Sequence, residues 1–105
     1  MRSNTLRSLL IVLLAWLAGC VPSLYMPSVQ DAAPGTSLEE LLRGREEYIQ
    51  QCGSCHSLYI PGRFRESEWR SALDSMQPRA HIDDTAKARI LHYILTGRAK
   101  DAPRD

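Results

Sequence analysis

The residues best suited to chemistry are Cys52, Cys55 and His56, which form the pattern Cys-Gly-Ser-Cys-His. Two thiols three positions apart, followed directly by an imidazole, match the attachment signature of a c-type haem. Cysteines at this spacing lie on one side of a helical turn, where both sulfurs can form thioethers with the haem vinyl groups. The histidine that follows then ligates the iron. We therefore expect one covalently bound haem, with His56 as its proximal ligand.

Three other uses of this pattern fit less well. A redox-active dithiol usually follows a strand and precedes a helix, whereas this pair follows a predicted helix. A zinc site needs further ligands close by, but the other histidines, His81 and His92, stand 25 and 36 residues beyond His56. A structural disulfide between the two cysteines would close a very small, strained loop.

The first 20 residues have the composition of an export signal. Arg2 and Arg7 precede an apolar run over residues 9–18, which is short for a membrane span because a span needs about 20 residues. Residues 17–20, Leu-Ala-Gly-Cys, resemble the lipobox of bacterial lipoproteins. This resemblance implies cleavage before Cys20 and lipidation of its thiol. An ordinary signal peptide and an uncleaved anchor helix are the alternatives.

Cleavage at that point leaves 86 residues, in which 11 instead of 13 basic residues face 12 acidic ones, so the formal net charge falls from +1 to −1. No basic block remains, and the sequence therefore does not predict nucleic-acid binding. Residues 21–36 contain three prolines and a glycine, a composition that predicts a tether. The expected organisation is a signal peptide (1–19), a lipidated cysteine with a flexible tether (20–36), one domain (37–100) and a tail (101–105).

Helical periodicity predicts three helices in the domain, and no strand pattern is visible. Ser37 and Glu40 form a capping box at the start of the first helix, which leads into the Cys-Gly-Ser-Cys-His pattern. The second helix is expected from about Ser67 to Met76, before a loop over residues 77–80. The third is expected to begin at Asp83 and to end at Thr96, with Gly97 as its stop. The apolar positions of the three helices are Leu38, Leu41, Leu42, Tyr48, Ile49 and Cys52; Trp69, Ala72, Leu73 and Met76; and Ala86, Ile90, Tyr93 and Ile94.

The fold class is therefore all-α. A domain of about 64 residues with few large apolar side chains is only marginally stable on its own, because small domains generally need an additional stabilising element such as a disulfide or a metal. Three short helices wrapped around one covalently bound haem would meet that need.

The pattern Gly44-x-x-x-Tyr48-x-x-x-Cys52-x-x-Cys55-His56, the later Met76 and the closing Tyr93-Ile94-Leu95 resemble the small monohaem cytochromes c of bacteria. The resemblance covers about residues 38–97. It implies that Gly44 packs against Tyr93, and that Met76 is the sixth iron ligand. The 20 residues from His56 to Met76 make a shorter segment than in common members of that family.

Several side chains are open alternatives or supporting candidates around the haem. Met76 also fits the apolar stripe of its helix as a core residue, and His81 and then His92 are the alternative ligands. His56 is expected to donate its second ring N–H to a backbone carbonyl near Pro61. The polar-tipped candidates for holding the haem propionates are Tyr59, Arg63, Arg65 and Trp69.

These features favour a non-enzymatic electron carrier, tethered to the cell membrane or outer membrane and facing the periplasm, with redox proteins as partners. A haem-based module that binds or senses small gases, with an open or weakly held sixth site, is the alternative from another class. An accessory subunit docked to a periplasmic dehydrogenase or oxidase is a third possibility.

Overall fold

The computed structural model describes residues 2–17 and 24–101, and this part of the chain is helical without a strand. Its α-helices are α1 (Arg2–Leu17), α2 (Leu38–Glu47), α3 (Glu66–Ala80) and α4 (Asp84–Asp101). Two 3-10 turns, η1 (Val29–Asp31) and η3 (Pro61–Arg63), and a π-helical turn, η2 (Tyr48–Cys52), complete the list. The expectation of an all-α fold is confirmed.

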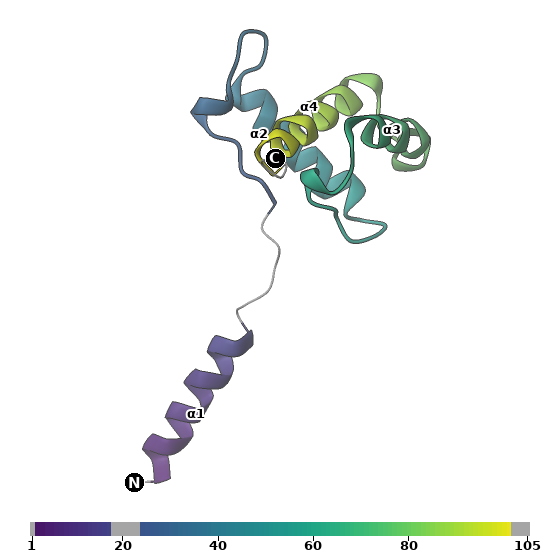
Figure 1. Cartoon of the computed structure of the whole chain (residues 1–105). Coiled ribbons are helices and arrows are strands. Elements are labelled where there is room, and N and C mark those ends of the chain that lie inside the picture. Colours follow the sequence, from purple (N-terminus) through teal and green to yellow (C-terminus); the bar gives the residue numbers. More distant parts are fainter. Residues whose placement is uncertain (1, 18–23, 102–105) are drawn as a thin grey trace.

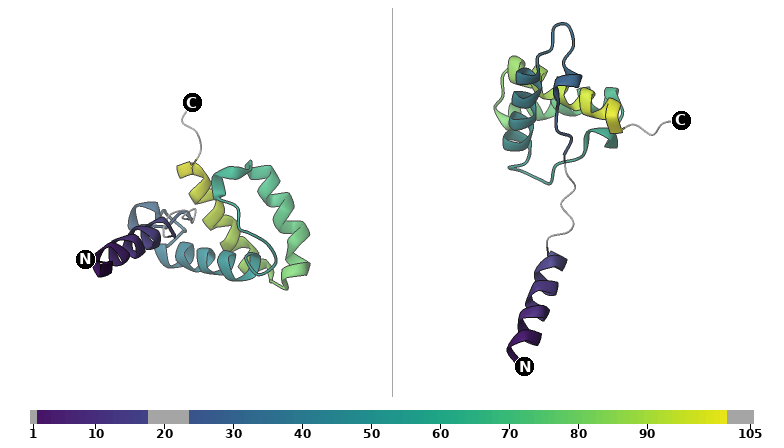
Figure 2. Two further views of the ribbon diagram at one scale, coloured as in Figure 1. Left: turned by 90° about the horizontal axis from the view of Figure 1, so that it is seen from below. Right: turned by 90° about the vertical axis from the view of Figure 1, so that its left-hand side faces the viewer.

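Helix α4 is the central element of the domain (Figure 1). It packs against α2, α3 and η3. Figure 2 shows α2 with its continuation η2 on one side of α4 and α3 on the other.

The 16 residues of helix α1 include Arg2, Arg7 and residues 9–17 of the predicted apolar run. No helix in residues 2–17 or 24–101 combines the length and the hydrophobicity that crossing a bilayer requires. The proposed cleavage and lipidation position, Cys20, lies outside the described residues.

Side-chain caps define where two of the helices begin. The Ser37 hydroxyl accepts a hydrogen bond from the Glu40 backbone N–H at 3.1 Å, and the Asp83 carboxylate accepts one from the Ala86 backbone N–H at 2.7 Å. Both caps satisfy N–H groups that have no partner within their own helix. The helix starts expected at Ser37 and Asp83 are confirmed.

The core forms where the faces of the three helices meet around α4. Gly44 of α2 lies so close to α4 that a Cβ added there would clash with the Arg89 carbonyl and lie 3.1 Å from the Tyr93 Cβ. The expected packing of Gly44 against Tyr93 is confirmed. Leu42, however, which was assigned to the apolar face of α2, is exposed. The buried hydrophobic side chains of the described chain are Leu41, Tyr48, Trp69, Leu73, Ile90, Tyr93 and Ile94.

Two predicted helix ends are wrong. Helix α3 does not stop at Met76 but continues through Pro78 to Ala80, and His81 ends it in the left-handed conformation with φ 54°. Pro78 has no N–H to donate to the carbonyl four residues before it, yet the helix continues for two more residues beyond it. Helix α4 continues past Gly97 to Asp101. Gly97 is needed there because a Cβ would lie 2.8 Å from the Tyr25 ring and 2.9 Å from Pro61.

Residues 24–36 do not form the flexible tether that their composition predicts. The Tyr25 ring stacks on Tyr93, with ring centroids 5.9 Å apart, and its carbonyl accepts hydrogen bonds from the Tyr93 hydroxyl at 2.8 Å and from Arg45 Nε at 3.2 Å. Asp31 pairs with Lys100 of α4 at 2.9 Å. This segment therefore belongs to the packed domain, whose first described residue is Leu24.

Candidate functional site

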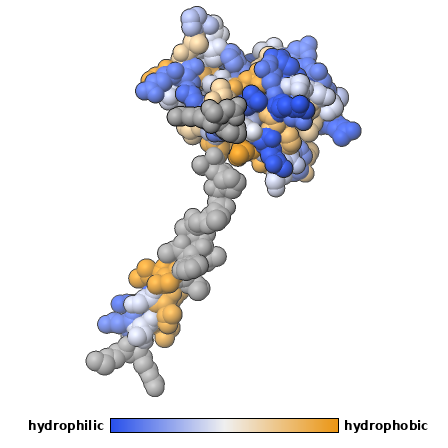
Figure 3. Space-filling view, viewed as in Figure 1, coloured by the Kyte–Doolittle hydropathy of each residue, from blue (hydrophilic) through white to orange (hydrophobic). Residues whose placement is uncertain are grey.

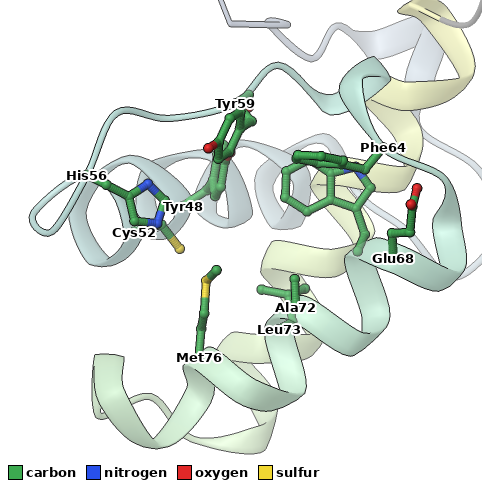
Figure 4. Close-up of a pocket in the computed structure, with 10 residues that line it drawn as sticks. Tyr48, Cys52, His56, Tyr59, Phe64, Glu68, Ala72, Leu73 and Met76 are labelled. Atoms are coloured by element: carbon green, nitrogen blue, oxygen red, sulfur yellow. The ribbon is translucent and has the colours of Figure 1, made fainter.

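A cavity of about 260 Å³ lies between η2, the loop that follows it and the side of α3 (Figure 4). A neighbouring cavity of about 160 Å³ shares three of its lining residues, Cys52, His56 and Met76. The two cavities are therefore adjoining parts of one cleft. The first is lined by Tyr48, Cys52, His56, Tyr59, Phe64, Glu68, Trp69, Ala72, Leu73 and Met76, and the second also by Gln51, Cys55, Arg79 and Ala80.

The two cysteines line this cleft from the end of the π-helical turn. Cys52 is half-buried and Cys55 is exposed, and both are free thiols. The turn closes with a hydrogen bond of 3.1 Å from the Gly53 N–H to the Ile49 carbonyl. Burial, and secondarily the neighbouring Cys55, raises the pKa of the Cys52 thiol above its usual value. Nucleophilic cysteines of redox-active dithiols have lowered pKa values, so this environment does not favour dithiol chemistry.

His56 lies on the same wall of the cleft as Cys52 (Figure 4). Its Nδ1 is 2.8 Å from the carbonyl oxygen of Ser57. With the proton on Nδ1 this nitrogen donates to the carbonyl, which leaves the Nε2 lone pair available to a metal. The expectation of a backbone carbonyl partner is confirmed, but its position near Pro61 is wrong. The carbonyl of Pro61 accepts a hydrogen bond from Trp69 Nε1 instead, at 2.8 Å.

That hydrogen bond corrects the role assigned to Trp69. Its ring lines the cleft, but its N–H is buried and already has a partner, so it is not free to hold a propionate. Tyr59 also lines the cleft and is exposed. Its backbone carbonyl accepts a hydrogen bond of 2.7 Å from the Tyr48 hydroxyl, which ties the loop after His56 to η2.

Helix α3 provides the opposite wall through one face. Glu68, Ala72, Met76 and Arg79 follow each other at intervals of four, four and three residues, so they share a side of the helix, and all four line the cleft. The Met76 side chain extends from α3 toward Cys52 and His56 (Figure 4). It is 36 % exposed, which shows that it is not a filler of the core formed by Trp69 and Leu73.

Sequence reasoning missed five residues of the cleft, which are Gln51, Phe64, Glu68, Arg79 and Ala80. Phe64 lies in the loop before α3, where no periodicity signals burial, and its ring packs edge-on against Trp69 with centroids 5.3 Å apart. Arg79 is three residues beyond Met76 and would have been placed on the same face had the helix been extended past Pro78. Its guanidinium supplies the cleft with a positive charge at the end away from Glu68.

The remaining candidate ligands do not line either cavity. His81 caps the end of α3 and is exposed. His92 of α4 is exposed as well, and its Nε2 lies 2.9 Å from the Thr36 hydroxyl. Arg65, a candidate for holding a haem propionate, also lines neither cavity. It pairs with Glu68 on the first turn of α3. Among the described residues, no group of three or more His, Cys, Asp or Glu side chains is arranged to hold a metal ion by itself.

Comparison of the chain with protein-family models, with curated proteins and with solved structures finds no match.

Proposed function

We propose that this protein is a membrane-tethered c-type cytochrome that carries one covalent haem and transfers electrons outside the cytoplasm. The observation that carries the proposal is the meeting of Cys52, Cys55 and His56 with Met76 across one apolar cleft. Met76 on one wall is 20 or more positions away in the sequence from the three residues on the other wall, yet all four line the same cleft.

The residues of the cleft fit a haem. Both thiols are unpaired, which is what thioether formation requires. His56 has one ring nitrogen engaged by a carbonyl at 2.8 Å, the arrangement that orients a metal-ligating histidine. The walls between the two cysteines and α3 are formed largely by the apolar and aromatic side chains Tyr48, Phe64, Trp69, Ala72 and Leu73.

A haem bound here would supply one-electron chemistry through the ferrous and ferric states of its iron. Cys52 and Cys55 would hold the group, and His56 and Met76 would ligate it from opposite walls. The aromatic side chains would exclude water from one face of the cleft, and Arg79, which lines the second cavity, would balance the charge of a haem carboxylate. Because a thioether stabilises the ferrous state and fills the sixth position, the position of Met76 favours a carrier over a gas sensor.

The membrane tether is the second part of the proposal. It rests on the leader and on the Leu-Ala-Gly-Cys segment at residues 17–20. Several acyl chains on Cys20 would anchor the protein durably, since each buried methylene contributes about 0.8 kcal/mol. Redox proteins of the periplasm or membrane are the corresponding partners.

Mass spectrometry of the mature protein tests the haem directly. We expect one haem per chain that survives denaturation in acidic organic solvent, and its loss in the Cys52→Ala/Cys55→Ala variant. The matched control is Cys20→Ser, which should keep the haem but lose lipidation, so that the protein shifts from the membrane to a soluble or precursor form. A haem that extracts into acidic solvent from the wild-type protein would overturn the proposal.

A further inference from the structure

A second apolar surface lies on the outer side of the loop that contains His56. It is an open hollow of about 450 Å³ lined by Leu24, Ile49, Gly53, His56, Ser57, Leu58 and Ile60. None of these residues is acidic or is a lysine or arginine, although 24 % of the chain is charged. Ile60 remains 43 % exposed. We call this surface the Leu24 face. Figure 3 shows hydrophobic surface at the lower edge of the domain, on the side where the described chain resumes at residue 24.

The position of Leu24 within the domain is fixed by its neighbour. The carbonyl of Tyr25 accepts two hydrogen bonds, from the Tyr93 hydroxyl at 2.8 Å and from Arg45 Nε at 3.2 Å, and its ring stacks on Tyr93. Leu24 itself packs against the core. The first residue of the described domain, Leu24, therefore lies at the edge of the Leu24 face and is already packed against the core.

The fixed position of Leu24 limits how far the domain can stand from a lipid anchor at Cys20. Four residue steps separate Cys20 from Leu24, and a fully extended chain spans at most about 14 Å over that length. If Cys20 is lipidated, its backbone lies at the level of the lipid headgroups. Leu24, at one edge of the face, is then held within that distance of the bilayer, and no lining residue of the face is acidic or is a lysine or arginine to oppose contact.

We propose that the Leu24 face rests on the phospholipid surface, so that the domain sits on the membrane in one orientation instead of swinging on a tether. This inference rests on the proposed lipidation of Cys20. Leu58 and Ile60 enter the headgroup region as apolar contacts, as exposed hydrophobic patches on soluble domains commonly do at interfaces. The α3 wall of the cleft, with Met76 and Arg79, is then not part of the membrane contact.

Photolabelling from the lipid phase tests the orientation. The mature lipoprotein with its haem is reconstituted into vesicles of phosphatidylethanolamine and phosphatidylglycerol that contain a trace of diazirine-bearing phospholipid. After illumination, labelled positions are mapped by mass spectrometry. We expect residues 58–60 to be labelled about fivefold or more above residues 66–79 of α3, because only the former enter the interface.

Two variants make the test specific. Ile60→Asp should reduce labelling of residues 58–60 to the level of α3. Val29→Asp is the matched control, because Val29 is 74 % exposed but does not line the hollow, and it should leave the labelling pattern unchanged. Haem content and lipid mass are measured on the same samples.

Labelling that is even over the domain, or confined to residues before Leu24, would overturn the inference while lipidated Cys20 and intact haem leave the proposed function standing. If the Leu24 face is unlabelled and the protein is extracted as a dimer, the face contacts a second copy of the chain and not the membrane, which would overturn the inference. An unlipidated Cys20 would remove the tether and this inference together, whereas a missing haem would contradict only the electron-transfer proposal.

Discussion

Gly44 of α2 lies directly against Tyr93 of α4, at a separation that leaves no room for a β-carbon. A Cβ at Gly44 would lie 3.1 Å from the Tyr93 Cβ and closer still to the Arg89 carbonyl. Since the clash is with backbone and a Cβ, neither neighbour can move without separating the helices. Gly44→Ala should lower the free energy of unfolding by about 1–3 kcal/mol, measured by urea denaturation.

The control for this variant is Glu46→Ala, on the same helix. Glu46 is exposed and interacts with Gln50 one turn later, so its replacement should change the free energy of unfolding by less than about 0.5 kcal/mol. Equal effects of the two substitutions would contradict the close α2–α4 contact.

Met76 is expected to determine the properties of the proposed haem. Met76→Ala should lower the reduction potential and allow carbon monoxide to bind the ferrous protein, because a thioether favours ferrous iron and occupies the sixth position. Visible spectroscopy and a redox titration measure both effects. His92→Ala and His81→Asn should leave the spectrum as in wild type; asparagine is used because residue 81 has φ 54°, which asparagine tolerates. Ready binding of carbon monoxide by wild-type protein would instead favour the sensor.

The hydrogen bond from Trp69 to Pro61 should contribute measurably to stability. Trp69→Phe leaves the Pro61 carbonyl, which now accepts the indole N–H at 2.8 Å, without a partner in a buried site. The free energy of unfolding should fall by about 1–3 kcal/mol. Arg70→Ala, which removes an exposed ion pair with Glu66, should cost less than about 1 kcal/mol. A Trp69→Phe effect no larger than this would show that the hydrogen bond contributes little.

Attachment of the segment before α2 should depend on pH through Asp31. Its carboxylate, 3 % exposed, pairs with Lys100 at 2.9 Å and accepts hydrogen bonds from the backbone N–H and the hydroxyl of Ser28. These partners, Lys100 most strongly, hold the pKa of Asp31 well below its usual range. A carboxyl with a lowered folded-state pKa stabilises the fold above its unfolded pKa of about 3.9, and this stabilisation is lost as the pH falls through the folded-state value.

Asp31→Asn should therefore lower the melting temperature at pH 6, and the difference from wild type should shrink as the pH falls below about 4. Circular dichroism melts of the Cys20→Ser protein measure this. Asp74→Asn serves as control, since Asp74 is exposed and pairs with Lys87 at the surface. A difference that stays constant from pH 6 into the acid range would exclude the charge of Asp31 as its cause.

The small core leads to a prediction for the protein without haem. The Cys52→Ala/Cys55→Ala variant should keep helical circular dichroism but lose a cooperative thermal transition and bind hydrophobic dyes, because domains of this size lie near zero net stability without a staple. The haem-containing Cys20→Ser protein should melt cooperatively. A sharp transition of the double variant within a few degrees of that protein would contradict the role of haem as a staple.

Local signals predicted the helix starts well and the helix ends poorly. Ser37 and Asp83 cap their helices through contacts within three residues, and such contacts are visible in the sequence. Pro78 and Gly97 are equally local signals for ending a helix, but the packing of neighbouring elements outweighs them. Gly97 is retained within α4 for close approach to Pro61 and not for its conformational freedom.

The same limit applies to the site. The spacing of Cys52, Cys55 and His56 contains the proposed chemistry, so this part could be predicted from a single sequence. The docking of Tyr25 could not, because its two hydrogen-bond donors, Arg45 and Tyr93, are 20 and 68 residues away. Proline-rich composition describes a preference of the isolated segment and does not include such distant partners.

The π-helical turn Tyr48–Cys52 constrains the length of the chain more than the identity of its side chains. A π-turn contains one residue more than an α-turn, and each residue of an α-helix rotates the chain by about 100°. Deleting one residue here would let α2 continue regularly and would rotate Cys52, Cys55 and His56 about the helix axis, away from α3. Substitution of an exposed residue such as Gln50 should leave the cleft intact, whereas deletion of a single residue from this turn should separate the two walls of the cleft.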